Sequence, residues 1–417
     1  MIVVVGAGLT GLALGHELKA RGVEHLVLEA SERPGGVIRS ARVDGHLLEW
    51  GPQRARLTGG LERLIAELGL QDELLIAPAG LPLFVFSRGK LRRVPFSPGE
   101  FVQSDIFSWA AKARLLLEPL TGGAREGERV ADYFTRKVGR DAYETLLGPL
   151  YGGLYASDPA DMIVDLSLGR VLKEFGIGRS LILPLLRRGG TITPPAACSF
   201  REGLQSLTTA LQSQNAENVK LSSPVRGIDR EGAAYRVILE DREVAAKAVV
   251  ITAPAAVAAR LLANVAPPAT AAVERLTYNS LAVVHLIADT GLSGLGYQVS
   301  FTEKLSTRGV TFNDSLFGRR GVYTAYLGGA RSPEIAWLPE RQLGDIARKE
   351  FRQVTGCDSE VISVARERMP AWDSSWKSMI GMALPDGIRI AANWESRPGM
   401  PGRLGQAAQL AASLAGS

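Results

Sequence analysis

The stretch Met1-Ile-Val-Val-Val-Gly6-Ala-Gly8-Leu-Thr-Gly11 decides the fold of this chain. An apolar strand runs straight into three glycines, and a helix-period stretch follows from residue 12 to about residue 21. Gly6 permits a tight turn, Gly8 lets the backbone approach a pyrophosphate, and Gly11 lets the helix pack close to the strand. Unpaired N–H groups and the helix dipole favour an anion at the helix N-terminus. This order of elements predicts a dinucleotide-binding βαβ unit.

The second strand of this unit supplies an acidic residue. The apolar run His25-Leu-Val-Leu28 ends on Glu29, about 20 residues after the glycines, where a carboxylate can accept hydrogen bonds from both hydroxyls of a ribose. A glycine triplet alone also occurs in ordinary turns. The arrival of strand, glycines, helix, strand and acid in this order is what favours nucleotide binding over a chance turn.

A glycine-rich loop follows directly, reading Ala30-Ser-Glu-Arg33-Pro34-Gly35-Gly36-Val37-Ile38-Arg39. Small residues let the backbone pass close to a second phosphate oxygen or a ribityl chain, and arginine suits phosphate oxygens. A nicotinamide domain would instead continue into its next crossover helix. The segment Leu48-Glu49-Trp50-Gly51-Pro52 predicts another close backbone approach. The alternative for Arg33 and Arg39 is a solvated surface pair.

With its Glu-x-x-x-Arg-x-Gly-Gly segment, this N-terminal part resembles the FAD-binding portion of the flavin amine-oxidase superfamily. The resemblance implies FAD as the cofactor and a fold of the α/β plus α+β class. It implies a Rossmann-like FAD-binding domain made of discontinuous segments, a substrate domain with a mixed sheet, and a helical insert. The expected domains are residues 1–90, 199–265 and 385–417 for FAD, 95–195 for the insert facing substrate and membrane, and 266–384 for substrate.

The remaining elements are expected from their periodicity. Helical spacing predicts a mostly helical region over about 95–186 and helices beginning near Ser199 and covering about 340–354 and 404–414. Alternating or buried apolar runs predict strands at about 219–229, 235–239, 248–253, 281–287, 322–327 and 388–394.

Both ends of the chain are expected to serve the cofactor. By the resemblance, the last strand delivers backbone N–H groups to the pyrimidine side of the flavin, the last helix points its positive N-terminus there, and the Val225 backbone meets the adenine. The predicted cofactor-binding residues are Gly6, Ala7, Gly8, Leu9, Thr10, Gly11, Glu29, Ala30, Arg33, Gly35, Gly36, Val37, Arg39, Gly51, Pro52, Gln53, Arg54, Val225, Trp394, Pro398, Gly399 and Met400.

Composition narrows the class of protein. The 417 residues are 46% hydrophobic and 22% charged, an ordinary globular balance, and no apolar run reaches the roughly 18 residues that span a bilayer. The two cysteines, Cys198 and Cys357, offer neither a disulfide framework nor a metal spacing, which favours a reducing, cytoplasmic setting. The net charge of +5 is spread along the chain, so nucleic acid is not indicated.

The middle of the chain is similar to the protoporphyrinogen and coproporphyrinogen oxidases. The resemblance rests on Gly148-Pro-Leu-Tyr-Gly-Gly153-Leu-Tyr-Ala-Ser-Asp158-Pro159, on a Leu172-Lys-Glu-Phe-Gly stretch, and on Phe200-Arg-Glu-Gly-Leu-Gln-Ser-Leu207. It implies an FAD-dependent oxidase of heme biosynthesis that aromatises a porphyrinogen by removing six electrons and six protons, with dioxygen as the acceptor. The chain departs from the family at Arg397 and at Gly402-Arg403.

No catalytic side chain or metal site is predicted. Aromatisation drives the reaction, and the four histidines show no metal-ligand spacing. An apolar slot over the flavin with a rim of arginines for the propionates would suffice; the candidates are Arg92, Arg93, Arg187 and Arg188. Because the chain has no second glycine fingerprint for a nicotinamide, dioxygen or another small acceptor is expected to reoxidise the flavin.

Other interpretations stay open. A flavin amine oxidase or a polyene desaturase of the same superfamily would share the N-terminal motif, and a non-catalytic lipid-binding protein or chaperone could be built on the same fold. The aromatic residues Phe96, Phe101, Phe107 and Trp109 among basic residues predict core packing of the helical insert, with a peripheral contact with the inner face of the cell membrane as the alternative. The expected partners are a porphyrinogen and dioxygen, with a membrane surface and a second copy of the chain as further candidates.

Overall fold

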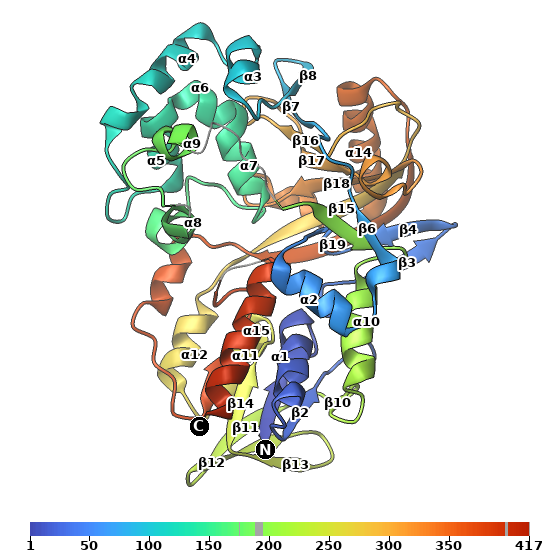
Figure 1. The fold of residues 1–417 in the computed structure, drawn as a ribbon, viewed down its shortest axis with the longest axis vertical. Coiled ribbons are helices and arrows are strands. Elements are labelled where there is room, and N and C mark those ends of the chain that lie inside the picture. The colour runs from blue at the N-terminus through green and yellow to red at the C-terminus, as the bar shows by residue number, and fades with distance from the viewer. Residues whose placement is uncertain (175, 188–194, 397–398, 417) are drawn as a thin grey trace.

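The computed structural model describes residues 1–174, 176–187, 195–396 and 399–416. The lower half of the molecule in Figure 1 is built on a five-stranded parallel sheet with the order β10-β2-β1-β14-β20. Its strands are β1 (Ile2–Val5), β2 (His25–Leu28), β10 (Val219–Lys220), β14 (Ala248–Ile251) and β20 (Ile388–Ile390). Since these strands come from three distant stretches of the chain, this half is discontinuous in sequence.

Helices cover both faces of this sheet, so its central strands are buried on both sides. Ile2 and Val4 pack with one group of helices, and Val3 and Val5 pack into the core on the other face. The first group is α1 (Leu9–Ala20), α2 (Gly59–Glu67), α10 (Gln205–Gln214) and α15 (Met400–Ala415). The second is α11 (Ala255–Leu262) and α12 (Pro267–Glu274).

The first and last helices lie side by side, α1 in blue and α15 in red (Figure 1). Each follows a strand of the parallel sheet, and both begin at the sheet's carboxyl edge, which faces the upper half of the molecule. Ligands of open α/β sheets bind outside this edge. The two helix N-termini therefore converge on the expected position of the cofactor.

A mixed seven-stranded sheet with the order β19-β15-β18-β17-β16-β7-β8 forms the core of the upper half. All neighbours are antiparallel except β16 and β7. Helix α14 (Glu340–Thr355) covers one of its faces. The strands are β7 (Leu83–Ser87), β8 (Lys90–Arg93), β15 (Tyr278–Ile287), β16 (Gly296–Val299), β17 (Thr307–Phe312), β18 (Val322–Gly328) and β19 (Glu360–Pro370).

Short helices build an insert at the upper left of Figure 1. They are α3 (Pro98–Gln103), α4 (Trp109–Leu116), η2 (Glu118–Thr121), α5 (Val130–Val138), α6 (Arg140–Ala142), the π-helical turn η3 (Tyr143–Leu147), α7 (Gly148–Gly153), η4 (Val164–Leu166), α8 (Leu168–Glu174) and α9 (Ile182–Arg187). Val85 of β7 packs into the core of the insert, which joins the insert to the upper sheet.

Smaller elements complete the fold. Three small sheets are formed by β3 (Ser40–Val43) with β4 (His46–Glu49), by β5 (Ala55–Arg56), β9 (Ala197–Phe200) and β6 (Leu74–Ile76), and by the meander β11 (Gly227–Glu231), β12 (Ala234–Ile238) and β13 (Glu243–Ala246). The short helices outside the insert are η1 (Gln71–Glu73), α13 (Asn313–Phe317), η5 (Pro333–Trp337) and η6 (Ser374–Met379).

The fold class is the predicted one, but several boundaries differ. Helix α1 begins at Leu9 rather than at residue 12, and α15 begins at Met400 rather than at 404, where Pro401 suits the first turn. The helix expected near Ser199 is preceded by strand β9. It begins only at Gln205, because Gly203 has a φ of +91° that breaks the regular backbone.

Two predicted strands and one domain boundary also change. The strand expected over 219–229 divides into β10 and β11 in different sheets, because Ser222, with a φ of +49°, turns the chain between them. The strand expected over 388–394 ends at Ile390. Residues 83–90 were expected in the FAD domain, but residues 83–86 pair with β16, so this segment belongs to the upper sheet.

In the part of the chain that the structure describes, we find no helix with the length and apolar character needed to traverse a bilayer.

Candidate functional site

The glycine turn after β1 is shaped by close backbone approaches and by the Thr252 hydroxyl, which donates to the Gly6 carbonyl at 3.0 Å. Gly6 has a φ of +110°, and a Cβ atom on Gly11 would lie 1.9 Å from the Gly6 carbonyl oxygen, so larger residues do not fit there. A Cβ atom on Gly8, in contrast, would meet nothing within 4 Å. Gly8 is also the N-cap of α1 and has no side chain to cap the helix, so the first-turn N–H groups stay available. The turn therefore fits a diphosphate.

Glu29 lies beside this turn, at the carboxyl end of β2. Its carboxylate accepts a hydrogen bond from the Ala7 backbone N–H at 2.7 Å and from the Ser31 N–H and hydroxyl at 2.9 and 2.8 Å. A carboxylate has about four acceptor positions, so capacity remains for a ribose hydroxyl. The Ser223 N–H donates to the Glu29 carbonyl, which brings the segment leading to Val225 to the same corner. Ser31 was not predicted from the sequence.

The second glycine loop folds back onto the first. The Gly35 N–H donates to the Ala7 carbonyl at 2.8 Å, and a Cβ atom on Gly36 would lie 3.3 Å from the Cα atom of Gly8. The Arg33 guanidinium donates to the Gly36 and Ile38 carbonyls, and burial lowers its pKa. Arg33 thus holds its own loop in shape, a role that was not considered from the sequence, and its contact with the cofactor stays a prediction.

The third backbone approach lies at Gly51. A Cβ atom there would lie 2.0 Å from the Val37 carbonyl oxygen, so glycine is required. The Arg39 guanidinium stacks 4.8 Å from the centre of the Trp50 ring. The side chain of Val37 itself is 58% exposed. Gly51 therefore holds the Val37 segment close to the loop that enters β5.

Gln53, predicted as a cofactor residue, has its side chain engaged elsewhere. Its amide nitrogen donates to the Glu49 carbonyl at 2.8 Å and to the Gly51 carbonyl at 3.1 Å. Its amide oxygen accepts hydrogen bonds from Asn313 and Thr324, each at 2.9 Å. Because every polar position of this buried amide is used, the Gln53 side chain ties the loop to the upper sheet instead of reaching the cofactor.

A buried ion pair next to Gln53 was not predicted. The Arg319 guanidinium lies 2.8 Å from the Glu49 carboxylate, and both side chains are almost fully buried. The Ser40 hydroxyl and the Leu204 N–H also donate to this carboxylate, yet burial raises the pKa of Glu49. His285 donates to the Glu49 carbonyl at 2.8 Å, and burial lowers its pKa to about 4. These side chains join the two halves of the molecule.

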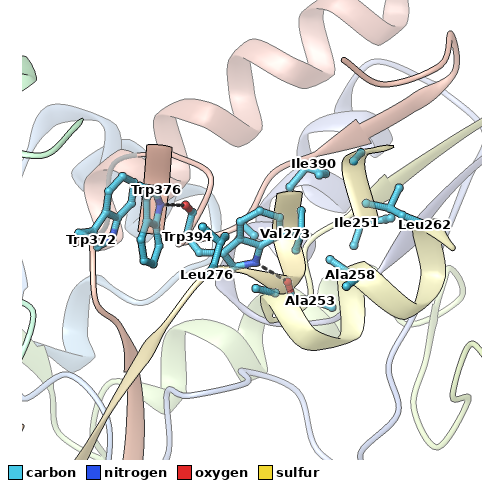
Figure 2. Close-up of a cluster of buried hydrophobic side chains, with 14 of the residues drawn as sticks. Ile251, Ala253, Ala258, Leu262, Val273, Leu276, Trp372, Trp376, Ile390 and Trp394 are labelled. Atoms are coloured by element: carbon cyan, nitrogen blue, oxygen red, sulfur yellow. Dashed lines mark hydrogen bonds between the residues drawn. The ribbon is translucent and has the colours of Figure 1, made fainter. Parts of the chain in front are cut away.

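Tryptophans line the carboxyl edge of the parallel sheet (Figure 2). The Trp394 indole donates to the Ala253 carbonyl, and the Trp376 indole donates to the Trp394 carbonyl, each at 2.9 Å. Trp372 stacks on Trp376 with ring centres 5.2 Å apart. The side chain of Trp394 is fully buried and packs with Ile251 and its neighbours. It was predicted as a flavin contact, but its ring belongs to the hydrophobic core.

The N-terminus of α15 is the last part of the site. Gly399 is its N-cap, with a φ of +98° and no capping side chain, and Met400 is the first helical residue. Arg403, in the first turn, is 5% exposed, donates to the Ala392 carbonyl and the Ser396 hydroxyl, and has its pKa lowered to about 10 by burial. Pro398 lies outside the described residues.

The remaining predicted residues fall in two groups. Leu9 and Thr10 are buried in the first turn of α1, whereas Ala30, Pro52 and Arg54 stay partly accessible. Their contacts with the cofactor remain predictions. The guanidinium groups proposed for the rim are engaged within the insert region: Arg92 pairs with Asp105 and Arg93 with Glu100, each at 3.1 Å. Arg188 and the side chain of Arg187 lie outside the described part of the chain.

An uncapped helix, a glycine cradle and an acid at the carboxyl edge of a parallel sheet define a dinucleotide-dependent oxidoreductase fold. Residues 9–384 match the family of flavin containing amine oxidoreductases, and the chain belongs to this family. FAD is its cofactor. The glycine cradle fits this group, since nothing fills the space before Gly8.

Curated relatives are similar over most of their length. The chain is 30% identical to the chloroplastic protoporphyrinogen oxidase of Oryza sativa subsp. japonica, over 84% of this chain and 74% of the relative. It is 28% identical to the protein of that name from Nicotiana tabacum, over 84% and 71%. It is 26% identical to the coproporphyrinogen III oxidase of Bacillus subtilis (strain 168), over 91% and 89%.

Solved structures of proteins with lower sequence identity also share this fold. A protein from Exiguobacterium sp. 255-15 superposes with a TM-score of 0.79 at 21% identity, covering 99% of this chain and 98% of that chain. Cyclohexylamine oxidase from Brevibacterium oxydans IH-35A gives a TM-score of 0.72 at 15% identity, covering 100% and 98%. At these identities the likeness shows the fold alone.

Proposed function

We propose that this protein oxidises a porphyrinogen, either protoporphyrinogen IX or coproporphyrinogen III, to the porphyrin, as a step of heme biosynthesis with dioxygen as the electron acceptor. The observation that carries the proposal is the agreement of the curated relatives, which are named for these two activities and match most of the chain at 26–30% identity. Cyclohexylamine oxidase, by contrast, shares the fold at only 15% identity.

The glycine-rich segment over 148–159 supports the same substrate class. Helix α7 packs on β16 and β17 of the upper sheet. A Cβ atom on Gly148 would lie 2.5 Å from the Phe301 ring, and one on Gly153 would lie 3.0 Å from the Gln298 amide oxygen. Glycine at these positions lets α7 approach the upper sheet closely, and the segment that carries them is the one that resembles the porphyrinogen oxidases.

The chemistry divides between the cofactor and the chain. Bound FAD supplies the two-electron oxidation, once for each pair of electrons that the substrate loses. The uncapped N-terminus of α1 and the backbone at Gly8 hold the diphosphate, and Glu29 holds the ribose. The uncapped N-terminus of α15 would place its positive dipole end near the isoalloxazine and stabilise negative charge on the reduced flavin. Proton loss is assigned to no side chain, because aromatisation supplies the driving force.

The alternative amine oxidase would typically place paired aromatic rings over the flavin. Trp394 was the aromatic that the C-terminal segment offered for this purpose, and its ring is fully buried in the core. This favours the porphyrinogen oxidase over the amine oxidase.

We also propose a peripheral membrane contact for the insert. The large apolar side chains exposed around α3, α4 and η2 are Val102 (57%), Trp109 (75%), Leu116 (82%) and Leu120 (82%). Lys112 lies 4.4 Å from the centre of the Trp109 ring, which suits an anionic lipid surface. Of the aromatics considered for this contact from the sequence, Phe107 packs in the insert core with Phe101, whereas Phe96 and Trp109 are exposed.

Steady-state turnover tests the proposed activity. The FAD-loaded protein in aerated buffer is expected to convert coproporphyrinogen III or protoporphyrinogen IX to fluorescent porphyrin while consuming dioxygen, and to leave benzylamine unchanged. Amine turnover without porphyrin formation would contradict the proposal. Sedimentation with anionic lipid vesicles tests the membrane contact, which a Trp109→Ser/Leu116→Ser variant is expected to lose.

A further inference from the structure

Arg54 lies in the loop over 49–54, named here the flavin loop, which packs against the upper sheet. It follows Gly51, Pro52 and Gln53, and the Gln53 side chain is hydrogen-bonded to Thr324 of β18 at 2.9 Å. The residue after Gln53 is therefore held against the same sheet.

The sheet residue that faces Arg54 is Tyr326. Along β18, Tyr323, Ala325 and Leu327 pack into the core beneath α14, so the alternate residues Thr324 and Tyr326 point to the opposite face. Thr324 contacts the flavin loop on that face. Tyr326 comes two residues after Thr324 in β18 and is thus directed towards the same loop.

Arg54 and Tyr326 lie close enough for the charge of one to affect the pKa of the other. Burial raises the pKa of Tyr326 to about 12, while the Thr311 hydroxyl and the Arg54 charge act in the opposite direction. Burial also lowers the pKa of Arg54, although part of each side chain stays accessible. Both side chains are therefore only partly exposed, so a ligand that meets them would be shielded from much of the solvent.

Arg54 differs from the other arginines near the cofactor. Arg33 donates to loop carbonyls, Arg39 stacks on Trp50, and Arg319 pairs with Glu49. Among the described residues, no hydrogen bond or ion pair engages the Arg54 guanidinium. A desolvated cation without a partner is costly, and an anionic ligand removes that cost.

We propose that Arg54, assisted by the Tyr326 hydroxyl, binds a carboxylate of the substrate and so orients the substrate between the flavin loop and the upper sheet. This inference rests on the proposed function, because a porphyrinogen carries propionate groups. It moves Arg54 from the predicted cofactor residues to the substrate side. The uncapped N-terminus of α1 would supply donors for the diphosphate without Arg54.

The test compares a porphyrin acid with its neutral ester. The FAD-loaded protein is titrated with coproporphyrin III and with its tetramethyl ester, and the quenching of porphyrin fluorescence gives both dissociation constants. Arg54→Gln is expected to weaken binding of the acid by about 10- to 100-fold, the value of a charge-assisted hydrogen bond, and to leave ester binding unchanged. Arg54→Lys is expected to restore part of the loss, and Tyr326→Phe to cause a smaller one.

Arg56→Gln is the matched control, since Arg56 lies two residues further on, is exposed and donates to the Pro195 carbonyl. It is expected to bind the acid and the ester like the unaltered protein. Equal losses for acid and ester in Arg54→Gln, or loss of bound FAD in that variant with acid binding unchanged, would overturn the inference.

Failure of the proposed function can be told apart from failure of this inference. If the unaltered protein oxidises neither porphyrinogen, benzoate and benzamide replace the porphyrins, and the shift of the flavin spectrum reports their binding. Preference for benzoate that disappears in Arg54→Gln would support a carboxylate site without porphyrinogen oxidation. Equal binding of both probes by the unaltered protein would refute the carboxylate site itself.

Discussion

The turn over 6–11 is shaped mainly by close approaches of its own backbone, with one hydrogen bond from the Thr252 hydroxyl and one to the Glu29 carboxylate. The loop over 49–54, in contrast, is held mainly by side chains that come from distant parts of the chain. In the turn, a Cβ atom on Gly11 would strike the Gly6 carbonyl, one on Gly6 would strike the Thr252 hydroxyl, and one on Gly8 would enter the open space proposed for the diphosphate. In the loop, Glu49 and Gln53 meet Arg319, Asn313 and Thr324 of the upper half. The turn is therefore a local nucleotide-binding element. The loop connects the two halves of the molecule, and we call it the joint.

This difference predicts that the turn is sensitive to added side-chain volume and that the loop is sensitive to the loss of a buried charged or polar group. Substitutions in the turn act through sterics and cofactor binding, and substitutions in the loop act through buried polar groups. The expected effects below run from the largest to the smallest.

Gly11→Val is expected to cost more than about 4 kcal/mol of unfolding free energy, because its Cβ atom would lie 1.9 Å from a backbone carbonyl that cannot move aside. Gly8→Val is the matched variant: it is expected to fold normally but to lose FAD, since its side chain fills open space. Urea unfolding and the flavin-to-protein absorbance ratio measure the two effects. Full flavin occupancy in Gly8→Val would contradict the assignment of the diphosphate site.

Arg319→Met is expected to lower the unfolding free energy by about 3–5 kcal/mol, because it leaves the buried Glu49 carboxylate without its cation. Arg320→Met, at the exposed neighbouring position, serves as the control with little change expected. The double variant Glu49→Gln/Arg319→Met is expected to recover much of the loss in urea unfolding. Equal stability of both single arginine variants would show that the ion pair does not hold the joint.

His285 gives the joint a pH dependence. Its pKa is lowered to about 4 by burial, so the folded protein holds the neutral ring while the unfolded chain takes up a proton below its ordinary pKa of 6.5. The contribution to stability is complete above about pH 6.5 and is lost as the pH falls towards 4, amounting to about 2–3 kcal/mol. His285→Gln is expected to flatten this part of the stability profile. A profile parallel to that of the unaltered protein would rule out this role.

Glu29→Ala is expected to weaken FAD binding by about 10-fold, the value of one charge-assisted hydrogen bond to the ribose, while the fold stays intact. Equilibrium titration of the apoprotein with FAD measures the change. Ser31→Ala removes a hydroxyl that binds the same carboxylate and is expected to have a smaller effect. Unchanged affinity in Glu29→Ala would remove this residue from the ribose site.

The parts of the molecule that follow from local geometry could be predicted from the sequence. This holds for the glycine turn, Glu29 and the last helix. Each lies within a continuous segment whose residue types indicate its conformation. The Glu49–Arg319 pair could not be predicted in this way, because its partners are 270 residues apart and either charge alone resembles a solvated one. The role of Gln53 was mistaken for the same reason: its position next to Gly51 suggested a cofactor contact, while its partners come from β18 and α13.

The wrong role given to the Trp394 ring has a different cause. An aromatic residue after the last strand fits a flavin contact and a core position equally well from sequence. Its burial is decided by the Ala253 carbonyl, which accepts the indole N–H at 2.9 Å, and by the apolar side chains of α11 around it (Figure 2). A pattern in one strand does not reveal which face its neighbours cover.

The most direct test of the central claim is anaerobic stopped-flow mixing of the FAD-loaded protein with coproporphyrinogen III and, separately, with protoporphyrinogen IX. The account predicts that one of the two bleaches the flavin absorbance rapidly while porphyrin fluorescence rises, and the faster one identifies the substrate. Retention of the oxidised flavin spectrum with both compounds, in a protein that holds FAD, would contradict porphyrinogen oxidation.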